Sequence, residues 1–171
     1  MAQRKVDHPA RQQRRTALIV GEGLAEQVFL SHLKALYVVR GHKQVTVKNA
    51  KGKGGAHVLD YTRRQGLQAA FDEMAALLDT DTDWDDEQRA LAKKWGIRVI
   101  EAQPCLEALL LRIAGQRVPH GTEACKKAFA KQFGAPAHEA AVLERHFTRA
   151  MLDNARPTVP ALDQLMQFLL R

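Results

Sequence analysis

The sequence has few cysteines and no long apolar segment, and each of these absences excludes a class of protein. Its 171 residues include only two cysteines, Cys105 and Cys125, which are too few and too irregularly placed for a disulfide framework or a zinc cluster. No apolar run approaches the roughly 18 residues that a membrane-spanning helix needs. The polar, Arg-rich start also lacks the hydrophobic region of a signal peptide. We therefore expect a cytoplasmic protein with reduced cysteines, no membrane association and a buried Cys105.

Several catalytic and ligand-binding motifs are absent as well. The segment 52–55, Gly-Lys-Gly-Gly, lacks the Walker spacing, and no Ser or Thr follows its lysine, which excludes an ATPase phosphate loop. The acids from Asp79 to Asp83 resemble the opening of a calcium-binding loop, but Trp84 and Ala90 stand where that loop requires glycine and a bidentate acid. The histidines lack the spacing of a helical zinc motif, and there is no Gly-x-Ser-x-Gly elbow.

The formal charge of +7 indicates a polyanionic partner such as nucleic acid, because cationic surfaces release counterions when they meet a phosphate backbone. Part of the excess charge lies in residues 1–15, which lack hydrophobic periodicity and which we expect to form a flexible basic arm. This arm either contacts nucleic acid or keeps the protein in solution. Its cations are Arg4, Lys5, Arg11, Arg14 and Arg15.

The remaining sequence alternates between apolar runs and helical periodicity, as in a parallel sheet covered by helices. We predict strands at 16–20, 44–48, 74–79 and 97–100, with helices at 24–40, 57–70 and 84–95 between them. The strand at 74–79 contains Glu, Met and Ala, which favour helix, but its abrupt end in alternating Asp residues favours a strand tip.

From Pro104 onward the pattern predicts helices only, at 105–114, 123–133, 138–153 and 159–170. The length of the chain fits one domain with a small addition. We therefore predict an α/β fold with a Rossmann-like parallel sheet of about four strands, flanked by helices and spanning residues 16–115. Residues 116–171 are expected to form an all-helical C-terminal extension that packs on the same domain.

The most informative segment is the acid run that follows the third predicted strand. Asp79 comes directly after the apolar run, and Asp81 lies two positions further on, so an extended backbone would project both side chains to the same side. Two such carboxylates could bind one hard cation. The later acids, Asp83 to Glu87, are typical of the first turn of a helix. That ordinary explanation also remains open for Asp79 and Asp81.

A second candidate acid, Glu22, lies between Gly21 and Gly23 where the first strand passes into a helix. The carboxyl ends of parallel strands meet at one edge of the sheet, so Glu22 and Asp79 are expected to lie at the same edge. The third glycine of a dinucleotide-binding fingerprint is replaced by Glu26, which argues against a dinucleotide. Gly-Glu-Gly is therefore either a plain structural turn or a turn that exposes a functional acid.

Lysines and arginines near the glycine-rich loop are candidates for contact with nucleic-acid phosphates. An ordinary solvated loop and helix face explains them equally well. The candidates are Lys48, Lys51, Lys53, Arg63 and Arg64.

Three segments, taken together, resemble the RloB-like family of TOPRIM-domain proteins. They are Leu-Ile-Val-Gly-Glu-Gly-Leu-Ala-Glu-Gln-Val-Phe at 18–29, Leu-Leu-Asp-Thr-Asp at 77–81 and Gln-Pro-Cys-Leu-Glu-Ala-Leu-Leu-Leu at 103–111. A weaker similarity lies at 154–158, Asn-Ala-Arg-Pro-Thr. The resemblance runs from about residue 16 to the end of the chain. The sequence departs from the family pattern beside the acids, including Gly21 in place of cysteine and Gln103 in place of asparagine, but every carboxylate is present.

The resemblance implies a TOPRIM sheet on which a glutamate and an Asp-x-Asp pair share a site that depends on Mg²⁺ or Mn²⁺. On this basis Glu22, Asp79 and Asp81 would bind the metal, and Glu26 and Glu107 would be further catalytic acids. The implied activity is that of a nuclease that hydrolyses DNA or RNA in phage defence associated with restriction loci. A protein partner, such as an ATPase from the same locus, would fit this setting.

Two other functions remain compatible with the sequence. In the first, the protein is a non-catalytic nucleic-acid-binding subunit of a defence complex, and its acids hold a structural cation or none. In the second, the same acids serve a phosphotransfer or nucleotidyl-transfer enzyme that acts on a small substrate.

Overall fold

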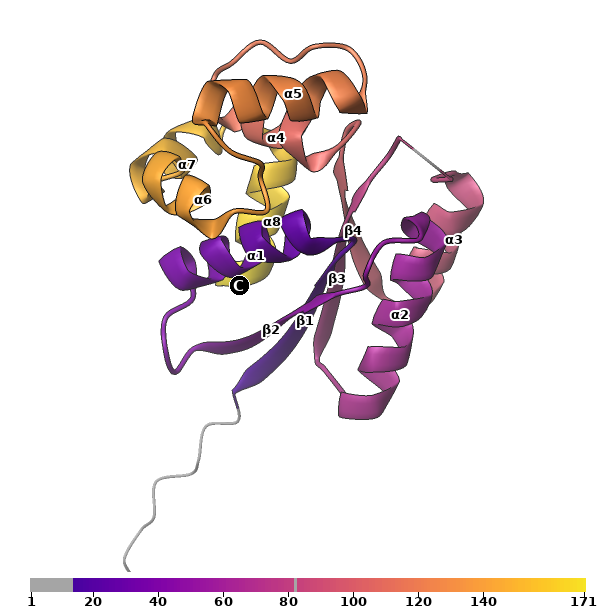
Figure 1. The fold of residues 1–171 in the computed structure, drawn as a ribbon. Coiled ribbons are helices and arrows are strands. Elements are labelled where there is room, and N and C mark those ends of the chain that lie inside the picture. The colour runs from indigo at the N-terminus through magenta and orange to yellow at the C-terminus, as the bar shows by residue number, and fades with distance from the viewer. Residues whose placement is uncertain (1–13, 82) are drawn as a thin grey trace, which may run out of the picture.

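A computed structural model describes residues 14–81 and 83–171 of the chain (Figure 1). The basic arm expected at 1–15 thus lies outside the described residues except for its last two, and Arg15 already belongs to the first strand. Within the described ranges, no helix is long and apolar enough to cross a membrane.

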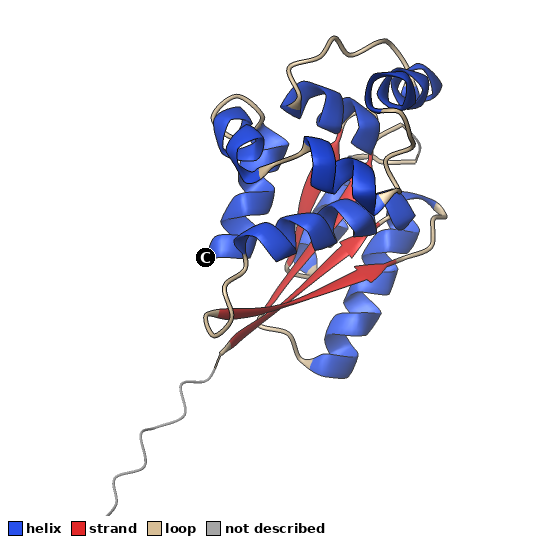
Figure 2. Cartoon of the chain, turned by 60° about the vertical axis from the view of Figure 1, so that its left-hand side comes forward, coloured by secondary structure: helices blue, strands red, loops and turns tan. Residues whose placement is uncertain are grey.

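The predicted α/β fold is confirmed, because four parallel strands form one sheet in the order β2-β1-β3-β4. The arrows in Figure 2 accordingly point the same way. The third strand is also confirmed despite its helix-favouring composition, since a central position buries its apolar run on both faces. The strands are β1 (Arg15–Gly21), β2 (Lys43–Asn49), β3 (Glu73–Asp79) and β4 (Ile97–Ala102).

Alternate residues of β1 face two different apolar clusters, as the period-2 geometry of a strand requires. Ala17 and Ile19 belong to a large cluster shared with the first and last helices, α1 (Leu24–Tyr37) and α8 (Pro160–Leu170). Leu18 and Val20 belong to a smaller cluster on the opposite face. That face is covered by α2 (Gly54–Ala69) and α3 (Asp86–Lys94), which lie together on the right in Figure 1.

The C-terminal region is helical as predicted, but the single helix expected at 138–153 is wrong. Phe147 ends the first part and is fully buried against Phe129, with ring centroids 6.2 Å apart. Thr148 then caps a new helix, because its hydroxyl accepts a hydrogen bond from the Met151 amide at 3.4 Å. The helices are α4 (Leu106–Ile113), α5 (Thr122–Phe133), α6 (Ala140–His146), α7 (Arg149–Ala155) and α8.

The turn between β1 and α1 is tight, and it requires glycine at its first position. A Cβ atom added to Gly21 would lie 2.6 Å from the Cβ of Glu26 and 2.9 Å from the backbone nitrogen of Gln27. Because α1 approaches this closely, its first turn is held directly above the end of β1. The Glu22 amide in turn donates to the Leu77 carbonyl of β3 at 3.1 Å. The two central strands are thereby joined at the carboxyl edge of the sheet.

The fold predicts that the C-terminal helices and the sheet unfold together. Leu165 of α8 is fully buried in the large cluster with residues of β1, so Leu165→Ala should destabilise the protein by about 2–5 kcal/mol. Leu67→Ala on α2 is the matched control, because Leu67 is 76% exposed; it should change stability by less than about 0.5 kcal/mol.

The measurement is urea unfolding followed by circular dichroism and by the fluorescence of Trp84 and Trp95, which pack in the opposite cluster. Both signals should shift to the same lower urea midpoint in Leu165→Ala. A shift in circular dichroism with an unchanged tryptophan transition would show instead that the helical extension unfolds as an independent unit.

Candidate functional site

Four acids predicted from the sequence line one cleft of about 500 Å³ at the carboxyl edge of the sheet. Glu22 comes from the turn after β1, Glu26 from α1, Asp79 from the last position of β3 and Glu107 from the first turn of α4. Parallel strands bring these distant parts of the chain to one edge. We call this space the acid cleft.

The Glu22 side chain, which follows β1, is held by a hydrogen bond to the end of the neighbouring strand β3. Its Oε2 atom accepts a hydrogen bond from the Asp79 amide at 3.1 Å, and the side chain is half-buried. Burial raises the pKa of Glu22, and repulsion from Asp81 and Asp83 adds to the increase, while the Asp79 amide acts in the opposite direction. The Glu22 carboxyl group therefore holds a proton more readily than an exposed glutamate does.

Asp79 carries the strongest electrostatic perturbation in the cleft. Its Oδ1 atom is buried and has no hydrogen-bond partner among the residues that the structure describes. Burial, followed by repulsion from nearby acids, raises the pKa of Asp79 to about 9; these acids are Glu26, Glu22, Asp81 and Glu107. A buried carboxylate without a partner is costly, and a cation bound at this point would supply the missing partner.

Glu26 has a structural role in addition to its place in the cleft. Its Oε2 atom accepts from the Gly23 amide at 2.8 Å, which caps the start of α1. Glu26 is only 6% exposed and Glu107 only 9%. Burial raises the pKa of Glu26, and repulsion from Glu107 and Glu22 adds to it. Both buried acids line the acid cleft.

Asp81 lies outside the lining of the acid cleft. The strand β3 ends at Asp79, so the extended geometry that would set the two carboxylates side by side does not continue to Asp81. Asp81 is exposed, and its Oδ2 atom accepts from the Thr122 hydroxyl at 2.5 Å. It remains close enough for its charge to raise the pKa of Asp79.

The acids that follow Asp81 form hydrogen bonds to the first turns of two different helices, α2 and α3. Asp83, expected in the first turn of α3, instead accepts from the Gly55 amide of α2 at 3.3 Å. Asp85 is the N-cap of α3 and accepts from the Gln88 amide at 2.9 Å. The interpretation as a helix start is therefore confirmed for Asp85 and the acids after it, whereas for Asp83 it is wrong, because that carboxylate turns towards α2.

The acid cleft suits a cation that takes few ligands from the protein. Within residues 14–81 and 83–171, no three His, Cys, Asp or Glu side chains form a ready metal-binding group. Mg²⁺ commonly binds through one or two carboxylates and completes its octahedron with waters and substrate oxygens. The donors available here are carboxylate oxygens, which hard cations prefer, and the buried Oδ1 of Asp79 is one that lacks a partner.

Two of the predicted phosphate-contacting lysines lie at the rim of the acid cleft. Lys51 and Lys53 flank Gly52, which lines the cleft and donates from its amide to the Glu22 carbonyl at 2.7 Å. Both lysines are exposed. Their positions in the chain therefore place two exposed positive charges next to a lining residue of the acid cleft.

The other three predicted basic residues have protein partners away from the cleft. Lys48 of β2 donates to the side-chain oxygen of Gln65. On α2, Arg63 lies over the Trp95 ring, 4.7 Å from its centroid, and Arg64 pairs with Asp60 of the preceding turn at 3.0 Å. The structure therefore does not bring these three side chains to the acids.

Lys126 and His138 line the acid cleft, although sequence reasoning did not select them. Lys126 lies on α5, and His138 lies in the segment before α6. No spacing in the sequence links either residue to Glu22 or Asp79, because both reach the cleft only through the packing of the helical extension. They add two groups that can contact an anion beside the acids.

The raised pKa of Asp79 predicts a specific dependence of stability on pH. Between the ordinary value of 3.8 and the folded value of about 9, the folded state holds a proton that the unfolded state has lost. The stability of the metal-free protein should therefore fall as pH rises through this interval. Asp79→Asn removes the effect, so the variant should exceed the wild type in stability at pH 8, by about 1 kcal/mol or more, and the difference should shrink towards pH 4.

Urea unfolding in EDTA at pH 4, 6 and 8 measures this difference. Glu87→Gln is the control, because Glu87 is exposed in the first turn of α3; it should follow the wild-type curve. An Asp79→Asn variant that is less stable than the wild type at pH 8 would contradict the electrostatic description of the cleft.

Comparisons with protein-family models, with curated proteins and with solved structures gave no significant match.

Proposed function

We propose that the protein is a Mg²⁺- or Mn²⁺-dependent nuclease that hydrolyses phosphodiester bonds of DNA or RNA in the acid cleft. The observation that carries the proposal is the buried, unpartnered Oδ1 of Asp79 among three further carboxylates. Such a cluster disfavours the metal-free protein and favours a bound cation. The cationic rim and the net charge of +7 support an anionic polymer as substrate.

The metal fits the oxygen donors of Asp79 and Glu22, with Asp81 near enough to contribute its charge. When bound, a divalent cation supplies charge neutralisation at a phosphate and a lowered pKa for a coordinated water. Glu22 and Asp79 are held together by the hydrogen bond from the Asp79 amide to the Glu22 carboxylate. This hydrogen bond fixes the Glu22 carboxylate relative to the backbone of Asp79.

Residues of the chain can account for the proton transfers of hydrolysis. Glu22 is the candidate general base, because its half-buried carboxylate lines the same cleft as the unpartnered Oδ1 of Asp79. In hydrolysis the water oxygen forms a bond to phosphorus, the bond from phosphorus to the sugar oxygen breaks, and Glu22 takes the water proton. His138 can return a proton to the departing oxygen, and Lys126 can hold a phosphate oxygen, since both line the same cleft.

The proposed setting is phage defence of the RloB-like type, in which an ATPase from the same locus would be a partner. This part of the proposal is supported by the sequence resemblance at 18–29, 77–81 and 103–111. It adds no residue to the site.

Cleavage assays test the proposed chemistry. The protein is incubated with labelled single- and double-stranded DNA and RNA in Mg²⁺ or Mn²⁺, and products are resolved on a gel. Asp79→Asn and Glu22→Gln should each lower the rate by about 100-fold or more, because they remove a metal donor or a general base, while Glu87→Gln should cleave as the wild type does. Equal cleavage by Asp79→Asn would overturn the site, and salt-sensitive binding with no product would favour a non-catalytic binding subunit.

Thermal unfolding with and without metal tests cation binding separately from catalysis. A ligand that binds only the folded state raises the melting temperature of the protein. Millimolar Mg²⁺ should therefore raise the Tm of the wild type at pH 8. The increase should be lost in Asp79→Asn and retained in Glu87→Gln. The same Mg²⁺-induced increase in both variants would place the bound cation elsewhere on the protein.

A second candidate function is phosphotransfer on a small substrate. The acid cleft, at about 500 Å³, falls within the range typical of small-molecule sites, about 300–1,000 Å³. Turnover of mononucleotides in the same metal buffers, with no cleavage of polymers, would favour this candidate over the nuclease.

A further inference from the structure

A second cleft lies at the opposite end of α1 from the acid cleft, and four of its lining residues are cationic. It has a volume of about 440 Å³, and among the residues that the structure describes none of its lining side chains is a carboxylate. It is built from the start of β1, the last turn of α1, the turn at 38–42 and the start of β2. We call it the basic cleft, and its cations are Arg14, Lys34, Arg40 and Lys43.

One of these cations is neutralised within the protein. Lys43 is buried, and its Nζ atom donates to Glu73 at 3.0 Å and to the Phe168 carbonyl at 2.5 Å. The ion pairs formed among the described residues do not include Arg14, Lys34 or Arg40. Among residues 14–81 and 83–171, three cations of the basic cleft therefore have no paired carboxylate.

Other carboxylates at this end of the molecule have partners of their own. Asp72 accepts from the Thr16 amide at 2.7 Å and from the Thr16 hydroxyl at 3.0 Å. Asp153 accepts from the Tyr37 hydroxyl at 2.7 Å. These hydrogen bonds hold both carboxylates at groups outside the lining of the basic cleft.

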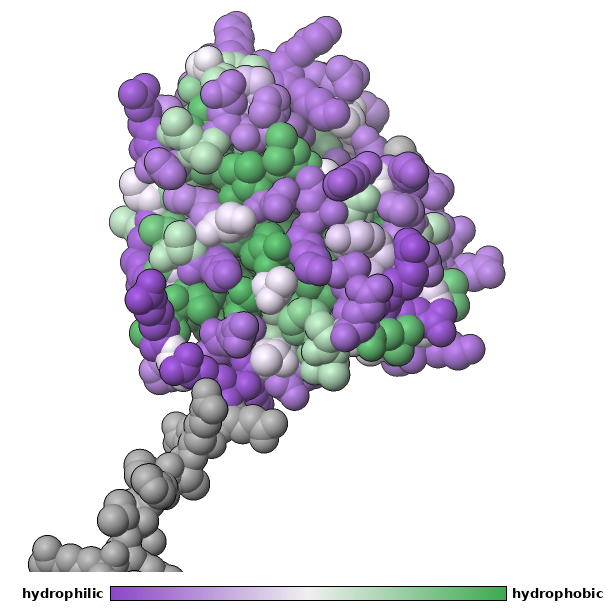
Figure 3. Space-filling model, turned by 60° about the horizontal axis from the view of Figure 1, so that its bottom comes forward, coloured by the Kyte–Doolittle hydropathy of each residue, from purple (hydrophilic) through white to green (hydrophobic). Residues whose placement is uncertain are grey.

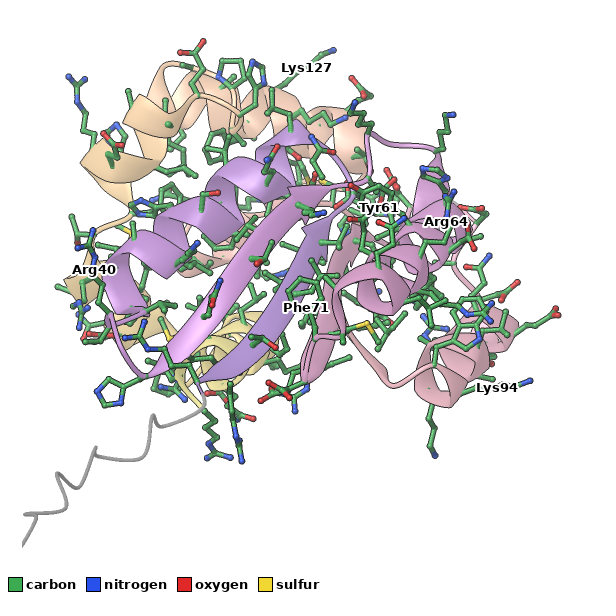
Figure 4. All side chains as sticks on the ribbon, turned by 90° about the horizontal axis from the view of Figure 1, so that it is seen from below. Arg40, Tyr61, Arg64, Phe71, Lys94 and Lys127 are labelled. Carbon is green, nitrogen blue, oxygen red and sulfur yellow. The ribbon has the colours of Figure 1, made fainter. Side chains whose placement is uncertain are left out.

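The charge of the basic cleft exceeds what the fold requires. Lys34 lies in the last turn of α1, where the helix dipole favours a cation. Arg14 and Arg40 come from other parts of the chain and are exposed; Arg40 is labelled at the turn between α1 and β2 in Figure 4. Bringing like charges together is unfavourable in the protein alone, and an anion in the cleft relieves that repulsion.

Helix α1 sets the distance between the two clefts. The acid cleft includes Gly23 and Leu24 at the start of α1, and the basic cleft includes Lys34 and Val38 at its end. At 1.5 Å per residue, the ten to fifteen positions between these residues correspond to roughly 15–22 Å along the helix axis. A nucleic-acid strand advances about 3.4 Å per nucleotide, so roughly four to six nucleotides would bridge the two clefts.

From this arrangement we propose that the basic cleft binds backbone phosphates of a nucleic-acid strand and anchors the polymer whose scissile bond lies in the acid cleft. The inference rests on the proposed function for the identity of the ligand. The recess favours a phosphate chain over an anionic membrane, since a phosphate can enter a hollow that a flat bilayer surface would only cover. Figure 3 views the molecule from this end, where hydrophilic side chains surround smaller apolar areas.

Binding without metal tests the anchor independently of catalysis. Fluorescence anisotropy of labelled 30-nucleotide DNA and RNA, single- and double-stranded, is measured in EDTA over a range of NaCl concentrations. The test variant is Arg14→Gln/Lys34→Gln/Arg40→Gln. The matched control is Lys93→Gln/Lys94→Gln/Arg145→Gln, which removes three exposed cations elsewhere and leaves the same net charge.

At 0.1 M salt, the Kd of the test variant should be about tenfold higher than that of the wild type, or more. The slope of log Kd against log salt should fall by about 2–3, because each lost phosphate contact lowers this slope by close to one. The control should change Kd by less than about twofold. Equal Kd values and slopes for the two triple variants would overturn the anchor, provided that circular dichroism shows both to be folded. Loss of binding to phosphatidylserine vesicles, with nucleic-acid binding unchanged, would overturn it in favour of a membrane surface.

Failure of this proposal can be separated from failure of the nuclease proposal. If the protein cleaves nucleic acid and the test variant retains the wild-type KM, the acid cleft acts without this anchor, and the inference is wrong. If the protein cleaves nothing but the test variant loses binding as expected, the basic cleft is a nucleic-acid site, and the nuclease assignment alone fails.

Discussion

The candidate site is organised by one hydrogen bond between the ends of the two central strands. The Asp79 amide at the end of β3 donates to the Glu22 carboxylate that follows β1. This contact exists because β1 and β3 are parallel neighbours in register, with Gly21 opposite Leu77. The close approach of α1 to Gly21 then fixes the turn that carries Glu22. Without this pairing, the acids would not share a cleft.

Burial gives these acids properties that an exposed acidic surface would lack. The raised pKa values of Asp79, Glu22 and Glu26 all have removal from water as their largest cause, with mutual repulsion adding to it. In the metal-free protein this cluster opposes folding at neutral pH, because unfolding would return the carboxylates to water. Such a cost is expected at sites that act on ligands, and it gives the proposed cation a physical role in stability as well as in chemistry.

The two ends of α1 carry opposite charge. Acids gather where the strands end, and cations gather where the strands begin, with Lys34 and Arg40 beside the last turn of the helix. A polyanion would be repelled by the acid cleft in the absence of metal, whereas at low salt it would be attracted by the basic cleft with or without metal. The proposed anchor therefore gives an anionic substrate a reason to stay near carboxylates that would otherwise repel it.

The pattern of the sequence was sufficient to predict the parallel α/β sheet, since strand and helix periodicities depend on neighbouring residues alone. It also placed Glu22 and Asp79 at one edge, because the ends of parallel strands must meet there. It did not predict the break at Phe147 or the turn of Asp81 towards Thr122, which arise from side-chain packing and from the point where β3 ends. Lys126, His138 and the basic cleft became visible only in the folded chain, because packing joins segments that no sequence spacing relates.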